Sequence, residues 1–221
     1  MLTDLHPELL PSLDRIPADR PVVLFTRHST REQPTNGFAG YDVPLTPSGR
    51  ELANAWGGRL GRPLHVALSS PVGRCVDTAR EMLAGAGHAH LDVAMVSQLV
   101  EPGCYVHDIR AIGKTFISLG PVGFANLHFS EELPGIRTAR EGTARLVDFM
   151  REQLGPPGSL SLLVTHDTIL AACMYTLLGV SRIDQAHWPW MMEGAFLWFG
   201  DDEVHWLWRG EQGSRALDTL R

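Results

Sequence analysis

The chain has 221 residues and a formal net charge of −6, with 19 Lys and Arg residues against 25 Asp and Glu. This length allows one large domain or two small ones, and a hydrophobic fraction of 44% excludes wholesale disorder. The acidic balance argues against a nucleic-acid-binding protein, which normally carries a basic face. Three widely spaced cysteines without a Cys-x-x-Cys pair argue against a disulfide framework and indicate a reducing cytoplasm.

The first twenty residues contain three prolines and predict an irregular lead-in with at most a short helix. They lack the basic and apolar regions of a secretory signal. No uncharged apolar run is long enough to span a bilayer, so we expect no contact with a membrane.

The first half of the chain alternates strand and helix signals. A β-branched run at residues 22–26 predicts a buried strand that ends at Arg27 and His28. Thr46-Pro47 has the form of an N-cap followed by a proline at the first helical position, and it predicts a helix that runs to about Leu60. A strand at 65–69 follows, and Ser70-Pro71 repeats the cap signal before a helix to about Leu83.

The second half continues the alternation, except for residues 101–134, where glycines and prolines obscure any pattern. The predicted elements are a strand over 91–96, a helix over 138–154, a strand over 160–165, a helix over 167–178 that Gly179 terminates, and a hairpin of 195–199 with 204–208. Strands that alternate with helices of about a dozen residues predict an α/β fold with a largely parallel sheet.

Five polar residues lie where three predicted strands end. Arg27 and His28 end the first strand, Arg74 lies in the first turn of the helix after the second, and His166 and Asp167 end the strand at 160–165. Ligands of open parallel sheets bind outside the carboxyl ends of the strands, so these side chains should share a pocket. Arginine forks match phosphate oxygens, and a neutral histidine can attack phosphorus. There is no Walker motif and no carboxylate cluster with metal spacing, so we expect neither a metal nor an organic cofactor.

The sequence around these positions resembles the histidine phosphatase superfamily, in its phosphoglycerate mutase-like branch. The resemblance rests on short segments in the same order: T-R-H-S-T at 26–30, N-G-F-A-G at 36–40, P-L-T-P-S-G at 44–49, S-S-P-V-G-R-C-V-D-T-A at 69–79 and V-T-H-D at 164–167. It implies a single three-layer α/β/α domain over residues 21–221, preceded by the lead-in at 1–20.

The resemblance also implies roles for individual residues. His28 would accept the phosphoryl group, while Arg27, Arg74 and His166 hold its oxygens. Asn36 and Arg31 occupy positions where members of the superfamily place further phosphate contacts, and Asp167 is a further candidate for contact with the substrate.

Two carboxyl groups compete for the role of proton donor. Glu101, in Leu99-Val100-Glu101, resembles the donor of the mutase-like branch, and Asp167, in His166-Asp167-Thr168, resembles that of the acid-phosphatase branch. We favour Glu101 because the rest of the chain follows the mutase-like branch. Asp167 could instead cap its own helix.

Two departures from the family pattern bear on activity. Ser29 replaces a usual glycine, which would cost roughly 1–2 kcal/mol if the position required a positive φ.

The sequence P-G-C-Y-V-H-D after Glu101 does not match the mutases, and segment 101–140 is expected to cover the pocket. Its polar residues are candidate substrate contacts: His107, Arg110, Lys114, Arg137 and Arg140.

We therefore expect a phosphatase that hydrolyses the phosphomonoester of a small molecule without a metal. The alternatives are a phosphomutase, or a weakly active phospholigand-binding protein if Ser29 is strained. Neither nucleic acid nor a membrane is an expected partner.

Overall fold

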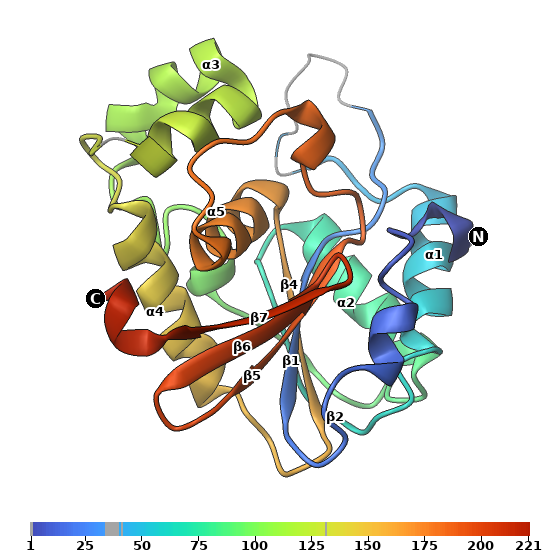
Figure 1. Ribbon diagram of the computed structural model, residues 1–221. Helices are drawn as coiled ribbons and strands as arrows, with labels where there is room; N and C mark the ends of the chain where they lie inside the picture. The colour runs from blue at the N-terminus through green and yellow to red at the C-terminus, as the bar shows by residue number, and fades with distance from the viewer. Residues whose placement is uncertain (1, 34–39, 41, 131) are drawn as a thin grey trace.

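A central sheet of seven strands organises the computed structural model, which describes residues 2–33, 40, 42–130 and 132–221 (Figure 1). The strand order is β3-β2-β4-β1-β5-β6-β7. The strands are β1 (Val22–Arg27), β2 (Leu64–Ser69), β3 (Val93–Met95), β4 (Leu160–Thr165), β5 (Gly194–Phe199), β6 (Glu203–Trp208) and β7 (Glu211–Ala216).

The four strands from β3 to β1 are parallel, and β5 to β7 continue the sheet in antiparallel fashion. The mixed, mostly parallel α/β fold expected from the sequence is therefore confirmed. The predicted C-terminal hairpin is present as β5 and β6, and β7 extends it at the edge of the sheet.

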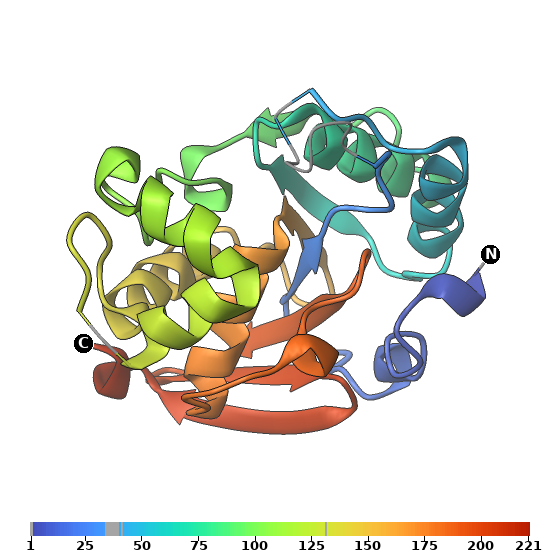
Figure 2. The ribbon, with the colours of Figure 1, turned by 90° about the horizontal axis from the view of Figure 1, so that it is seen from above.

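Helices cover both faces of the sheet (Figure 2). The helix bounds are α1 (Pro47–Gly57), α2 (Gly73–Gly85), α3 (Ile109–Ser130), α4 (Ala139–Glu152) and α5 (Asp167–Leu178), with 3₁₀ turns at Leu2–Asp4, Pro11–Asp14, Ser97–Leu99, Gln185–His187 and Leu217–Leu220. One layer contains α1 and α2, and the other contains α3, α4 and α5.

Alternate residues of β1 face the two layers. Val22 and Leu24 pack with α1 and α2, whereas Val23 and Phe25 pack with the opposite layer, and all four are fully buried. A strand covered on both faces is apolar at every position, which is the pattern that residues 22–25 show. The lead-in also joins the core, because Leu5, Leu9 and Ile16 are buried in the cluster of α1 and α2.

Helices α1 and α2 approach each other closely at glycines. A Cβ atom added at Gly57, the last residue of α1, would overlap the backbone carbonyl of Met82 in α2. Only a residue without a side chain allows this contact between the two backbones.

Local signals explain most of the helix ends. Thr46 caps α1 as predicted, and its hydroxyl accepts the Gly49 N–H at 2.9 Å. Gly179 ends α5 in the left-handed conformation, with φ 72°. The prediction for α2 was wrong by two residues, because the helix begins at Gly73 and its N-cap residue, Val72, provides no side-chain bond.

Helix α3 occupies part of the segment in which the sequence showed no clear element. It bends sharply at Gly120, where φ is 66° and ψ is 176°, directly before Pro121. The two arms lie at the upper left of Figure 1, and α3 contacts α5 below it. Among the described residues, no helix is both long enough and apolar enough to cross a membrane.

Candidate active site

Three adjacent strands bring the predicted residues together. Strands β2, β4 and β1 are neighbours in the sheet, so their carboxyl ends meet at one edge. The hydrogen bonding continues past the strand ends, because the His28 N–H donates to Thr165 O at 3.0 Å and the Ser70 N–H donates to Val164 O at 2.9 Å. The residues that follow each strand are thereby held side by side.

The His28 ring is fixed by hydrogen bonds at both nitrogens. Arg74 Nε–H donates to His28 Nε2 at 3.1 Å, and His28 Nδ1 lies 2.8 Å from Ser29 O. This network requires the neutral tautomer in which Nδ1 carries the proton and Nε2 carries a lone pair. Burial and then the charge of Arg27 lower the pKa of His28 well below its usual value, so the ring stays neutral at pH 7.

His166 lies edge-on to His28, with 5.6 Å between the ring centroids. Its Nε2 is 2.9 Å from Ser70 Oγ, and its Nδ1 is 3.5 Å from an Arg74 guanidinium nitrogen. Burial and then Arg74 lower the pKa of His166 to about 4, so this ring is also neutral at pH 7.

Arg27 and Asp167 form an ion pair in the site. Arg27 Nη2 lies 2.8 Å from Asp167 Oδ2, and Arg27 Nη1 donates to Pro189 O at 2.5 Å. The buried Arg27 Nε–H has no hydrogen-bond partner among the described residues. Burial alone would raise the pKa of Asp167, but Arg27 holds it below its ordinary value, so Asp167 is a carboxylate at neutral pH.

Ser29 is fully buried and unstrained. Only Met192 and Arg209 have a positive φ among the described residues other than glycine, so the backbone at position 29 does not need glycine. The Ser29 hydroxyl donates to Gly49 O at 2.7 Å, and the backbone N–H donates to Thr78 Oγ1 at 3.0 Å. These bonds tie the residue after the nucleophile candidate to the first turn of α1 and to α2.

Glu101 lies beyond the end of β4. The Thr165 hydroxyl donates to Leu99 O at 2.9 Å, which holds the chain before Glu101 beside the strand end. The Glu101 carboxylate accepts the N–H groups of Val106 at 2.8 Å and Tyr105 at 3.1 Å. Burial nevertheless raises the pKa of Glu101 to about 7, although these N–H groups lower it.

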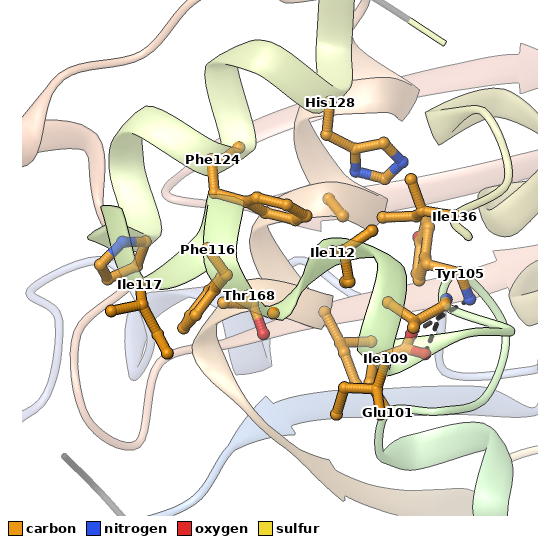
Figure 3. Close-up of a pocket in the computed structure, with 16 residues that line it drawn as sticks. Glu101, Tyr105, Ile109, Ile112, Phe116, Ile117, Phe124, His128, Ile136 and Thr168 are labelled. Carbon is orange, nitrogen blue, oxygen red and sulfur yellow. Dashed lines mark hydrogen bonds between the residues drawn. The ribbon is translucent and has the colours of Figure 1, made fainter. Parts of the chain in front are cut away.

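Glu101 forms part of the wall of a cavity of about 330 Å³ that α3 covers (Figure 3). The two arms of α3 contribute much of the lining, and Thr168 and Ile169 contribute from the first turn of α5. The lining residues from segment 101–140 lie between Glu101 and Ile136.

The remaining candidate residues differ in their surroundings. Three of them are exposed and do not line the cavity: His107, Arg110 and Lys114. Burial lowers the pKa of both Arg27 and Arg74, and the positive charge of Arg31 lowers both pKa values further. Asn36 lies outside the described residues. Arg137 and Arg140 are engaged with the backbone: Arg137 donates to the carbonyls of 103–105, and Arg140 donates to Thr219 O and Arg221 O.

Sequence reasoning missed three contributors to the site. Ser70, interpreted as a helix cap, contacts His166 instead, and its place at a strand end was the signal for this role. Trp188 Nε1–H donates to Asp167 Oδ2 at 3.2 Å, and the Pro189 carbonyl holds Arg27. No sequence pattern marks a backbone carbonyl or an indole as part of a site. No group of three or more His, Cys, Asp or Glu side chains in the described ranges could hold a metal ion.

The family model of the histidine phosphatase superfamily (branch 1) matches residues 23–195. The chain belongs to this superfamily. The matched residues include Arg27, His28, Arg74 and His166, which the sheet brings together. No curated protein matches the chain.

Solved structures of similar fold include YhfR, a mutase and two phosphatases. YhfR from Bacillus stearothermophilus has a TM-score of 0.62 at 18% identity, covering 86% of this chain and 96% of its own. Phosphoglycerate mutase from Bacillus anthracis str. Sterne has a TM-score of 0.57 at 18% identity, with coverages of 92% and 97%. A phosphoserine phosphatase mutant from Entamoeba histolytica, in complex with phosphoserine, has a TM-score of 0.59 at 16% identity, with coverages of 90% and 98%. The mycobacterial glucosyl-3-phosphoglycerate phosphatase in complex with VO3 has a TM-score of 0.56 at 19% identity, covering 86% of this chain and 100% of its own. At these identities the likeness shows a shared fold.

Proposed function

We propose that this protein is a phosphomonoesterase that works through a phosphohistidine intermediate on His28. The observation that carries the proposal is the neutral His28 ring, whose Nε2 lone pair accepts the Arg74 Nε–H at 3.1 Å and whose pKa the charge of Arg27 helps to lower. Guanidinium groups that surround a nucleophile attract the phosphoryl group and stabilise the charge of the transition state.

In the first step, His28 Nε2 attacks phosphorus and forms an N–P bond. The bond from phosphorus to the leaving oxygen breaks, and its electron pair stays on that oxygen. Arg74 exchanges its bond to His28 Nε2 for bonds to the phosphoryl oxygens. The Arg27 Nε–H supplies a further donor, because it has no hydrogen-bond partner among the described residues. Leaving a buried donor without a partner costs about 1–3 kcal/mol, and a bond to a phosphoryl oxygen removes that cost.

Glu101 protonates the leaving oxygen. Its pKa of about 7 leaves a large fraction of the carboxyl group protonated at neutral pH, whereas Asp167 is held as a carboxylate by Arg27. Water then attacks the phosphohistidine while the Glu101 carboxylate accepts its proton. Inorganic phosphate leaves, and Nε2 regains its lone pair.

Two observations favour hydrolysis by an active enzyme over the alternatives. The unstrained Ser29 removes the feature that suggested a weakly active phospholigand-binding protein. The cavity beside Glu101 has no Lys or Arg among its described lining residues, whereas a mutase acting on a phosphoglycerate must hold a substrate carboxylate.

The test is hydrolysis of p-nitrophenyl phosphate with a metal chelator present. We expect His28→Ala to lower kcat/KM on the order of 10³-fold or more. His90→Ala is the matched control, because His90 is exposed in the loop before β3 and should leave activity unchanged. Intact-mass spectrometry after a rapid alkaline quench should detect a phosphorylated chain in the wild type only. Full activity in His28→Ala would overturn the proposal.

A further inference from the structure

The cavity beside Glu101 has an almost entirely apolar wall. Six aliphatic and aromatic side chains form most of it: Ile109, Ile112, Phe116, Ile117, Phe124 and Ile136. Figure 3 shows them gathered around one space, with Glu101 at its border. A volume of about 330 Å³ is at the lower end of the range for small-molecule sites, roughly 300–1,000 Å³.

The charge of this wall restricts what can enter. Glu101 is the single charged residue among the described lining residues. His128 also lines the cavity, but its Nε2–H donates to Arg137 O at 2.9 Å and burial lowers its pKa, so the ring is neutral. A carboxylate or second phosphate in this space would lose its hydration without gaining a cation. An apolar group would instead gain free energy from burial.

The cavity adjoins the phosphoryl site through two elements. Thr168 and Ile169 line it and directly follow His166 and Asp167 at the start of α5. Glu101 lines it as well, and in the proposed function this carboxyl group contacts the leaving oxygen. The organic group bonded to that oxygen must therefore begin at Glu101.

We propose that this cavity binds the organic group of the substrate, and that the substrates are phosphomonoesters of apolar aliphatic or aromatic alcohols with no second anionic group. This inference rests on the proposed phosphatase function and specifies its substrate class. Ile109 and Ile117, which are 50% and 63% exposed, form an apolar rim along which a longer chain can extend.

A series of n-alkyl phosphates from ethyl to octyl tests the inference. The leaving alcohols of the series have nearly the same acidity, so the rate of the chemical step should be nearly constant. Only the apolar surface of the alkyl chain changes. We expect kcat/KM to rise about two- to fourfold per added methylene until the cavity is full, the upper value corresponding to about 0.8 kcal/mol per buried methylene. An alkyl phosphate of matched length that ends in a carboxylate should react more slowly than its methyl-ended counterpart. A flat series, or faster reaction of the carboxylate ester, would overturn the inference.

Gly113 offers a variant that closes the cavity without disturbing the core. It lies in α3 and lines the cavity, and a Cβ atom added there meets no atom within 4 Å. We expect Gly113→Phe to lower the octyl-to-ethyl ratio of kcat/KM at least tenfold while ethyl phosphate hydrolysis stays within about threefold. Ser118→Phe is the matched control, because it adds the same side chain at an exposed position of α3 that does not line the cavity, and it should preserve the ratio. An unchanged ratio in Gly113→Phe would place the alkyl chain elsewhere.

Binding of n-alkylphosphonates to the wild type, measured by calorimetry, separates the inference from the proposed function. These compounds keep the phosphorus anion and the chain but cannot be hydrolysed. Affinity that rises with chain length supports the cavity even if no ester is hydrolysed, an outcome that would overturn the phosphatase proposal alone. Affinity independent of chain length would overturn the cavity inference while leaving the phosphatase proposal intact.

Discussion

Two carboxyl groups near the site differ in what surrounds them. Asp167 faces the Arg27 guanidinium at 2.8 Å, whereas Glu101 faces backbone N–H groups and an apolar cavity. The ion pair lowers the pKa of Asp167 against its burial, and burial raises the pKa of Glu101 to about 7. Two carboxyl groups close to one site thus differ in protonation at neutral pH, as the proposed function requires of an anion and a proton donor.

This difference predicts the pH dependence of hydrolysis. The donor must be protonated, so kcat/KM for an alkyl phosphate should fall as pH rises through about 7, approaching tenfold per pH unit. Glu101→Gln should abolish that fall and lower the rate at pH 6, and p-nitrophenyl phosphate should be affected less because its leaving oxygen needs little protonation. Comparing both proteins on one substrate cancels the titration of the substrate itself.

Asp167→Asn is the control for this experiment, because it removes the other carboxylate. It should lower the rate at every pH by loosening Arg27, yet keep the fall centred near pH 7. If Asp167→Asn lost the decrease of kcat/KM with rising pH and Glu101→Gln kept it, the proton donor would be Asp167 and not Glu101.

At single positions, the sequence predicted which side chains lie together better than it predicted their individual contacts. Arg27, His28, Arg74 and His166 do meet, because strand-end placement follows from the order of strands and helices. The role of Ser29 could not be predicted, because a residue type does not determine its own φ. The Arg137 contacts were equally hidden, since its partners are backbone carbonyls that any sequence would supply.

Among the elements, α1 and α2 are held together by backbone contact at Gly57. Alanine favours helices over glycine, yet a Cβ at this position would meet the Met82 carbonyl. We expect Gly57→Ala to lower the free energy of unfolding by about 1–3 kcal/mol, as overpacking typically does. Gly113→Ala, in open space on α3, should raise it by about 0.5–1 kcal/mol. Urea denaturation measures both, and equal effects of the two substitutions would contradict this account.

Elements with strong local signals were predictable, and the others were not. Helix α4 shows a capping box in which Thr138 and Glu141 satisfy each other's backbone N–H groups, and its apolar periodicity was clear. Helix α3 was hidden because Gly113, Gly120, Pro121 and Gly123 interrupt the helical pattern. Strand β7 was hidden because its sequence is polar and does not alternate, and its pairing with β6 places it in the sheet.

Across the whole molecule, Arg209 joins parts of the chain that are distant in sequence. It lies in the turn between β6 and β7, and its Nε donates to the Glu193 carboxylate at 2.6 Å. It also donates to the Tyr175 hydroxyl at 3.0 Å. Glu193 is 1% exposed, and its backbone carbonyl accepts the Arg27 N–H at 2.9 Å. Arg209 in the turn therefore holds Glu193, and the Glu193 carbonyl in turn holds Arg27 at the end of β1.

Removing this cation should destabilise the fold strongly. Arg209→Met leaves the Glu193 carboxylate buried without a counter-charge, which typically costs about 3–5 kcal/mol. The free energy of unfolding from urea denaturation should fall by that amount, and the double variant Arg209→Met/Glu193→Gln should recover much of it. A loss below about 1 kcal/mol in Arg209→Met would show that the pair is not a main support.

The central place of β1 in the sheet determines when the protein can become active as it is synthesised. Strand β1 pairs with β4 and β5, so no strand partner exists for it before residue 160 has left the ribosome. Until then its apolar run stays unpaired and available to chaperones, as late-pairing strands generally are. Arg27 remains solvated until Pro189 and Glu193 arrive. A nascent chain therefore contains the proposed nucleophile, His28, early in translation, but the contacts that surround the site form only near the end.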